Sequence, residues 1–400
     1  MPTSITNSSF VPFHRPLIGE EEIQEVVATL RSGWLTSGER TQRFEKEFRE
    51  YVQASHSLAL NSCTAALHLG LVAIGAGSGD EVITTPLTFC ATVNSILHTG
   101  AKAVLADVDQ DGNIDPERIA ALITARTKAI LPVHLGGLPC NMDAIWDLAR
   151  KHNLYVIEDA AHACGARYQG HPIGQTTDAL CSDVTAYSFY ATKNLTTGEG
   201  GMATTPHAHI YERMRMLALH GISRDAWARY TAKGSWLYDV LEPGFKYNLS
   251  DIQSAIGIHQ LHKLNSFIEE RRRQAERYSN AFNKYCELET PRERQESRHA
   301  WHLYLLKLNL EELSIDRARF IELLRAQNIG TSVHFIPIPK LRFFAELADS
   351  NPCPRAEEIY QRIISLPIYP GLTEAEQERV ISAVTGIVSK YRRSLYAVGA

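Results

Sequence analysis

Two hydrophobic periodicities alternate along the first two thirds of the chain. Short apolar runs rich in β-branched residues predict buried strands, and the segments between them carry apolar residues three and four positions apart, which predicts amphipathic helices. The predicted strands contain SLAL, EVITT, AKAVLA, KAILPV, LYVIE and VTAYSFY. Apolar strands that alternate with helices are typical of a mostly parallel sheet with helices on both faces. We therefore expect an α/β fold.

The pattern changes near residue 264. A long charged helix is predicted there, followed by AWHLYLLKL, DRARFIELLRAQ, TSVHFIP and a final helix near 373–394. These elements predict a smaller C-terminal α+β domain (264–400) after an N-terminal arm and large domain (1–263). Within the long helix, the run EERRRQAER (269–277) has charges at helical spacing and is interpreted as a solvated face.

Composition narrows the possible classes of function. The chain has 400 residues, of which 44% are hydrophobic and 22% charged, as in ordinary globular proteins. Its formal net charge of -4 disfavours a nucleic-acid partner. No apolar run approaches the ~18 residues of a membrane helix, and the start lacks the apolar segment of a secretory signal. The seven scattered cysteines form no CxxC pair, which predicts reduced thiols in a cytoplasmic protein and no metal site.

One lysine stands in an unusual position. The stretch SFYATKNLTTGEGG (188–201) places Lys193 between a predicted buried strand and a glycine-rich tail. Glycine tolerates positive φ and close backbone contacts, so the tail predicts a tight loop. Because desolvation disfavours the charged amine, a lysine at this point is either paired with a carboxylate or neutral and nucleophilic.

Other strand ends carry polar groups that could meet this lysine, since ligands bind at the carboxyl ends of parallel strands. After SLAL, either Asn61 or Ser62 can cap a helix whose first turn contains Thr64 and Ala65. The free amides of such a helix N-terminus suit a phosphate. An ordinary N-cap is the alternative.

Two more strand ends complete the candidate site. Phe89 follows EVITTP and could either cover a planar ring or belong to the core. Asp159 follows four apolar residues and is costly to bury alone, so it pairs either with a ligand or with a structural cation. A phosphate cradle, an aromatic ring, a carboxylate and an amine together match the needs of pyridoxal phosphate.

Seven segments carry a resemblance to a known family. They are SGWLTSGE, NSCTAALHLGL, GDEVITTPLTF, VIEDAAHACGA, SFYATKNLTTGEGG, GFKYNLSDIQSAIG and SLPIYPGLT, in this order between about residues 12 and 385. They resemble the DegT/DnrJ/EryC1/StrS family of sugar aminotransferases. The resemblance implies a fold-type I, pyridoxal-phosphate-dependent enzyme. By this resemblance, such an enzyme is expected to transfer an amino group from L-glutamate, leaving 2-oxoglutarate, to a nucleotide-linked keto sugar, for a cell-surface glycan such as lipopolysaccharide.

Within the family, EPGFKYNLSDI, AWHLYLLKL and IGTSVHF resemble the UDP-4-amino-4-deoxy-L-arabinose aminotransferase. This likeness implies a UDP-linked 4-keto sugar as acceptor. A dTDP- or GDP-linked sugar, aminated at C3 or C4, is the alternative.

The resemblance also implies roles for individual residues. Lys193 matches the lysine that binds the cofactor, Asp159 the carboxylate that pairs with the pyridine nitrogen, and His162 the residue that faces the ring and its 3-hydroxyl. The remaining expected cofactor ligands are Thr64, Ala65 and Ser188 at the phosphate, Phe89 stacked on the ring, and Asn248. Asn248 matches an asparagine that reaches the phosphate of the other subunit, which implies a homodimer with shared sites.

Departures from the family pattern lie on the substrate side. His334 is expected near the substrate, although a structural histidine is an equal alternative. Tyr190 replaces the usual histidine of SFH, and Pro339 replaces the second histidine of HFxPxH. We therefore expect the sugar specificity to differ from that of the arabinose enzyme.

Two rival functions follow from the same likeness. Some relatives replace the lysine by histidine and remove a hydroxyl, and the presence of Lys193 argues against this reaction. A cofactor-binding regulator without catalysis is the other rival, but the sequence shows no appended helix-turn-helix segment.

Overall fold

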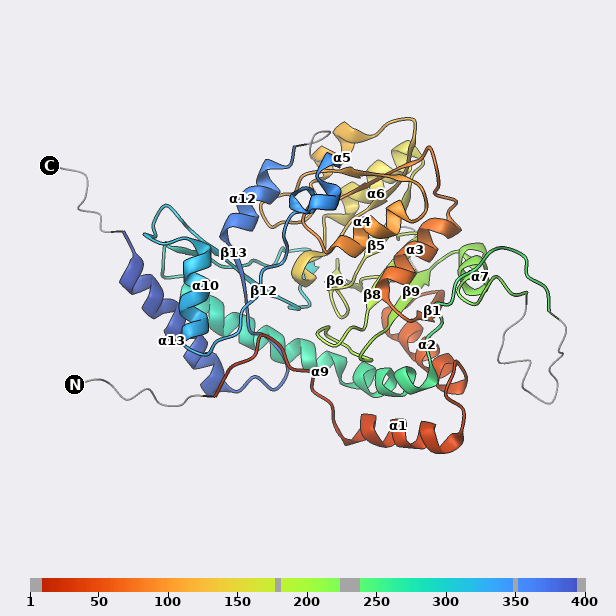
Figure 1. Cartoon of the computed structure of the whole chain (residues 1–400), viewed down its shortest axis with the longest axis horizontal. Coiled ribbons are helices and arrows are strands. Elements are labelled where there is room, and N and C mark those ends of the chain that lie inside the picture. The colour runs from red at the N-terminus through yellow and green to blue at the C-terminus, as the bar shows by residue number, and fades with distance from the viewer. Residues whose placement is uncertain (1–8, 177–180, 224–237, 348–351, 394–400) are drawn as a thin grey trace.

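The computed structural model describes residues 9–176, 181–223, 238–347 and 352–393. Its centre is a seven-stranded sheet in the order β1-β9-β8-β5-β4-β2-β3. Figure 1 labels β1, β9, β8 and β5 of this sheet. The strands are β1 (His56–Leu60), β2 (Glu81–Thr84), β3 (Lys102–Leu105), β4 (Thr127–Leu131), β5 (Tyr155–Asp159), β8 (Val184–Ser188) and β9 (Gly201–Thr205). From β3 to β8 all neighbours pair in parallel, whereas β9 is antiparallel to β8 and β1. The predicted mostly parallel sheet is confirmed.

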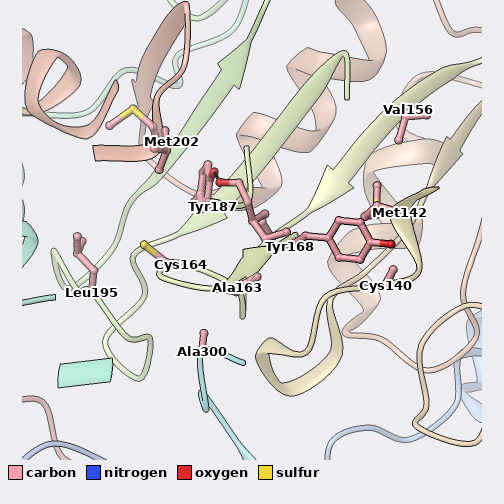
Figure 2. Close-up of a cluster of buried hydrophobic side chains, with 14 of the residues drawn as sticks. Cys140, Met142, Val156, Ala163, Cys164, Tyr168, Tyr187, Leu195, Met202 and Ala300 are labelled. Carbon is pink, nitrogen blue, oxygen red and sulfur yellow. Dashed lines mark hydrogen bonds between the residues drawn. The ribbon is translucent and has the colours of Figure 1, made fainter. Parts of the chain in front are cut away.

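Both faces of the sheet are buried, which explains the continuous apolar runs of its strands. In β4, for example, Ile130 belongs to one buried cluster and Leu131 to the other. The first face is covered by α2 (Glu39–Val52), α5 (Pro116–Leu122), α6 (Met142–His152) and α9 (Asp251–Phe282). The second face is covered by α3 (Cys63–Ala73), α4 (Cys90–Leu97) and α7 (Ala208–Leu217). Figure 2 shows part of the first cluster, including Tyr187 and Met202.

Helix α9 contributes to two of the hydrophobic clusters, one on the central sheet and one in the C-terminal part. It begins at a capping box, in which the N–H of Gln253 donates to Ser250 Oγ (3.4 Å) and the N–H of Ser250 donates to Gln253 Oε1 (3.2 Å). Its first half packs on the sheet, and its second half contributes Tyr278 and Phe282 to a separate C-terminal cluster. The expected domain division at 263/264 falls inside this helix.

The C-terminal part contains a second, antiparallel sheet in the order β10-β12-β13. Its elements are β10 (Leu288–Glu289), β12 (Tyr304–Leu308), α10 (Arg317–Ala326), α12 (Pro354–Arg362), β13 (Ile363–Leu366) and α13 (Glu374–Tyr391). A small third sheet has the order β11 (Ser297–Arg298), β6 (Arg167–Tyr168) and β7 (His171–Pro172). The described residues also form the 3₁₀ turns η1 (Leu135–Gly137), η2 (Ile338–Lys340) and η3 (Arg342–Phe344). The N-terminal segment joins this part, because Val11 is fully buried there and bridges Ile329.

Two details differ from what the sequence pattern suggests. The apolar positions Ile23 and Leu30 of α1 (Glu20–Ser32) are exposed, whereas Glu22 is buried and binds Lys263 of α9 (2.7 Å). The interpretation of residues 269–277 as a solvated face is wrong at Arg271. This guanidinium is fully buried because its Nη1 donates to three backbone carbonyls.

Neither a membrane span nor a metal cluster is found in the part of the chain that the structure describes. No helix there combines enough length with enough hydrophobicity to cross a bilayer. No group of three or more His, Cys, Asp or Glu side chains is arranged to hold a metal ion.

Candidate active site

A cavity of about 530 Å³ lies at the carboxyl ends of β5 and β8. It is the place where most of the predicted site residues come together. The predicted residues in its lining are Thr64, Phe89, Asp159, His162, Ser188, Tyr190, Lys193 and His334. Ala65, Asn248 and Pro339 are not in this lining. The α/β topology thus unites residues that are up to 270 positions apart, as expected for the edge of a parallel sheet.

Asp159 is a buried carboxylate with hydrogen bonds but without a salt bridge. Thr92 Oγ1 donates to Oδ2 (2.8 Å), and the N–H of Ala161 donates to Oδ1 (3.1 Å). Cys63 Sγ lies 3.9 Å from Oδ1. Burial raises the pKa of this carboxyl group, although these hydrogen bonds and Lys193 act in the opposite direction. Among the described residues Asp159 has no cation within salt-bridge distance, so the structural ion pair is not observed and a cationic ligand group fits here.

Lys193 follows the end of β8 by five residues. The predicted strand is longer than the observed one, because β8 ends at Ser188 and a turn places the N–H of Lys193 2.9 Å from the carbonyl of Tyr190. The amine lines the cavity, and burial lowers its pKa to about 8 although Cys63 and Asp159 oppose this effect. A large part of the amine is therefore neutral and nucleophilic near pH 8.

His162 presents one defined nitrogen to the cavity. The backbone N–H of Gly136 donates to its Nδ1 (3.2 Å), so Nδ1 must be the unprotonated nitrogen. Burial and the neighbouring Lys193 keep the pKa of the imidazole well below its usual value. The ring is therefore neutral, and its proton resides on Nε2, which can donate a hydrogen bond to a ligand oxygen.

The N-terminus of α3 forms another wall. Ser62, rather than Asn61, is the N-cap, and its Oγ accepts from the N–H of Ala65 (3.1 Å). Of the two predicted phosphate-binding residues in α3, Thr64 lines the cavity and Ala65 uses its amide for the cap. A Cβ on Gly201 would lie 2.6 Å from the backbone nitrogen of Cys63. The glycine-rich tail therefore allows the close approach that its sequence predicts.

The mouth of the cavity is aromatic. Phe89 is 59% exposed, so the core alternative is excluded, and its ring lies 6.1 Å from that of Phe335. Tyr190 is 46% exposed. His334 hydrogen-bonds Ser365 Oγ through Nδ1 (2.7 Å) and stacks on Phe13 from the N-terminal segment (5.5 Å).

Asn248 faces a different cavity of about 550 Å³, whose lining includes Trp34 and Ser37. Its Nδ2 donates to Ser37 Oγ (2.7 Å), and Lys246 Nζ donates to its Oδ1. Asn248 therefore does not reach the cavity of Lys193 in its own chain.

Several lining residues were missed by sequence reasoning. Thr92, Cys63 and Phe335 stand beside predicted residues, so their polarity or aromaticity close to a motif was an available signal. Phe13 and His302 come from segments whose approach depends on tertiary packing. No local pattern could have placed them in this cavity.

The residues present fit pyridoxal phosphate. The fit rests on the buried Asp159 without a counter-charge, the amine of Lys193, the Nε2–H of His162 and the polar N-terminus of α3. When bound, this cofactor supplies an electron sink for amino transfer.

Comparison with known proteins identifies close relatives. The model of the DegT/DnrJ/EryC1/StrS aminotransferase family matches residues 16–385. The spore coat polysaccharide biosynthesis protein SpsC of Bacillus subtilis is 49% identical over 386 residues, which cover 95% of this chain and 97% of SpsC. An uncharacterized protein of Methanocaldococcus jannaschii is 51% identical over 387 residues, 96% of this chain and 99% of that protein.

Solved structures share the fold over nearly their whole length. Spr1654 of Streptococcus pneumoniae, a proposed sugar aminotransferase solved in its PLP form, has a TM-score of 0.87 and 32% identity, with 95% of this chain and 99% of that chain covered. PseC of Helicobacter pylori, an aminotransferase involved in the biosynthesis of pseudoaminic acid, has a TM-score of 0.88 and 28% identity, with 96% and 100% covered. The chain therefore belongs to the DegT/DnrJ/EryC1/StrS aminotransferase family and is a PLP-dependent sugar aminotransferase.

Proposed function

We propose that the acceptor is a nucleotide-linked keto sugar, most specifically a UDP-linked 4-keto sugar, and that L-glutamate is the amino donor. The observation that carries this proposal is the meeting of Lys193 and the unpaired, buried Asp159 in one cavity with exposed aromatic residues at its mouth. SpsC acts in polysaccharide biosynthesis by name, which supports a product for a cell-surface glycan. A dTDP- or GDP-linked sugar, aminated at C3 or C4, is the alternative.

Each side chain at the inner end has a defined task. Asp159 holds a proton on the ring nitrogen, since its carboxylate is the only acidic group in the described lining that has no cationic partner and is fully desolvated. Lys193 Nζ takes up and returns a proton at the reacting carbon, which its lowered pKa permits near neutrality. His162, whose Nδ1 accepts from Gly136, would donate through Nε2–H to the ring hydroxyl oxygen and so orient the ring.

The working unit in this proposal is a cytoplasmic homodimer with shared sites. Asn248 is held by Ser37 and Lys246 at the wall of a separate cavity, where it is available to a second copy. Its amide would reach the cofactor phosphate of the partner subunit. A structure of the holoenzyme in which Asn248 contacts no neighbouring cofactor would contradict the shared site.

Product analysis tests the acceptor. The purified holoenzyme is incubated with glutamate and a panel of UDP-, dTDP- and GDP-linked 3-keto and 4-keto sugars. We expect the UDP-linked 4-keto sugar to be aminated fastest. Faster amination of a dTDP-linked 3-keto sugar would contradict the UDP and C4 assignments and leave the aminotransferase assignment intact. A holoenzyme that binds the cofactor but forms no 2-oxoglutarate would instead support the regulator.

A further inference from the structure

His302 is a histidine of the reaction cavity to which neither the sequence motifs nor the reaction assigns a role. It lies just before β12, its side chain is only 5% exposed, and it lines the cavity together with Lys193. Its ring centroid is 4.5 Å from that of His162. Its Nδ1 is buried and has no hydrogen-bond partner among the described residues. Because a buried polar atom without a partner is costly, a ligand in this cavity that hydrogen-bonds the imidazole would offset part of that cost.

The backbone around His302 is held from two sides. The N–H groups of Ala300 and Leu303 donate to the carbonyls of Gly137 (2.9 Å) and Gly136 (3.1 Å). Arg271 Nη1 donates to the carbonyl oxygen of His302 (3.3 Å). The ring is therefore placed at the cavity wall by a fixed backbone rather than by a mobile loop.

Gly137 makes the approach of the two histidines possible. Its φ of 99° is in the left-handed region, and a Cβ there would lie 2.8 Å from the carbonyl oxygen of His162 and 3.3 Å from the nitrogen of His302. The residue before His302, Trp301, also has a positive φ of 48°. Non-glycine residues in this conformation are uncommon and occur often at functional sites, which agrees with a role in binding.

The protonation state of the His302 imidazole determines which substrate groups it can bind. Burial, together with His162 and Lys193, keeps the pKa of His302 well below its usual value, so the ring is neutral. A neutral imidazole hydrogen-bonds hydroxyl and carbonyl oxygens, whereas the carboxylates of glutamate bind cations better. The groups that lower this pKa include His162, Lys193, Arg271 and His334. His302 is therefore within electrostatic reach of the reacting amine, and it lines the same cavity.

We propose that His302 binds the acceptor sugar, through a hydrogen bond to the hydroxyl or keto oxygen next to the reacting carbon, and so contributes to sugar specificity. This inference rests on the proposed function, because it requires a sugar acceptor with free oxygens at that position.

Two variants separate the hydrogen bond from the packing. His302→Phe keeps a ring against His162 but removes both nitrogens, and His302→Gln keeps polar atoms in a smaller, non-aromatic side chain. The apparent KM for glutamate and for the best keto sugar of the panel are measured for the wild type and both variants. Thermal unfolding and the affinity for pyridoxal phosphate, followed by absorbance, are recorded in parallel.

We expect His302→Phe to raise the acceptor KM about 10-fold, the upper range for one neutral hydrogen bond, and to change the glutamate KM much less. His302→Gln should recover most of the loss. Equal changes for both substrates, or a weakened affinity for the cofactor, would overturn the assignment in favour of a role toward the cofactor or the fold. An unchanged acceptor KM in the Phe variant would overturn it outright.

The rates of the wild type on the sugar panel distinguish failure of the proposed acceptor from failure of the proposed role of His302. If the wild type prefers a sugar with another nucleotide, the UDP assignment fails, and His302 is tested on that sugar instead. If the wild type aminates no nucleotide-linked sugar in the panel, the acceptor assignment and the role of His302 both fail.

Discussion

The inner end and the mouth of the reaction cavity are built in different ways. At the inner end, Asp159 and His162 are almost fully buried, and each is fixed by a backbone N–H. At the mouth, Phe89 and Tyr190 are exposed (59% and 46%) and come from separate loops. The inner end is therefore suited to one fixed reaction, whereas residues at the mouth can be replaced to suit a different sugar with little loss of stability. The predictions below test this division, from the largest effect to the smallest.

Lys193→Ala should abolish amino transfer. The variant removes the only amine in the described lining of the cavity, so neither cofactor attachment nor proton transfer at the reacting carbon can occur. Formation of 2-oxoglutarate from glutamate measures the loss. Lys151→Ala, in the exposed part of α6, is the matched control and should retain full activity. Substantial activity in Lys193→Ala would show that another group performs the proton transfer.

Asp159→Asn should lower the rate by at least ~100-fold, comparable to the loss of an electrostatic stabiliser of the transition state. The amide has nearly the same shape and leaves the fold intact, but it cannot hold a proton on the ring nitrogen. Single-turnover kinetics with glutamate measures the loss. Asp147→Asn, on the exposed face of α6, controls for the substitution itself. A rate close to that of the wild type would make Asp159 a structural residue.

Thr92→Val should cost about 10-fold, because it removes one hydrogen bond to a buried carboxylate. That hydrogen bond lowers the pKa of Asp159, so its loss should raise the pKa further. The ionised form is the active one, and activity falls as the pH drops through the pKa. The acidic limb of the pH–rate profile should therefore move to higher pH. A lower rate with an unmoved acidic limb would mean that Thr92 acts on packing alone.

Much of the inner end could be predicted from sequence, because its residues stand in short contiguous motifs at strand ends. Asp159 ends a buried strand, and Lys193 stands between a buried strand and a glycine-rich tail, so short local patterns singled out both residues. The state of His162 required coordinates, since its tautomer depends on the amide of Gly136, which comes from a distant turn.

The mouth could not be predicted to the same extent. Phe13 meets His334 only because the N-terminal segment pairs with residues 328–330 of the C-terminal part. The sequence pattern predicts that Arg271 is one charge in a solvated run, yet it is buried and donates to the carbonyls of Trp301, His302 and Ile368, which come from two distant segments. Hydrophobic periodicity carries no information about such long-range polar contacts.

Tyr190→His should have the smallest effect. The side chain is exposed at the mouth and the change restores the usual family residue, so we expect stability within ~0.5 kcal/mol of the wild type. The ratio of kcat/KM values for a pentose and a 6-deoxy hexose acceptor should change by only a few-fold. A loss of cofactor binding in this variant would contradict the separation between the mouth and the inner end.

The most direct test of the account is to locate the lysine that binds the cofactor. The protein is incubated with pyridoxal phosphate, reduced with borohydride, digested and analysed by mass spectrometry. The account predicts a pyridoxyl adduct on the peptide that contains Lys193, and loss of that adduct in Lys193→Ala. An adduct on a different lysine, with Lys193 unmodified, would contradict the central claim.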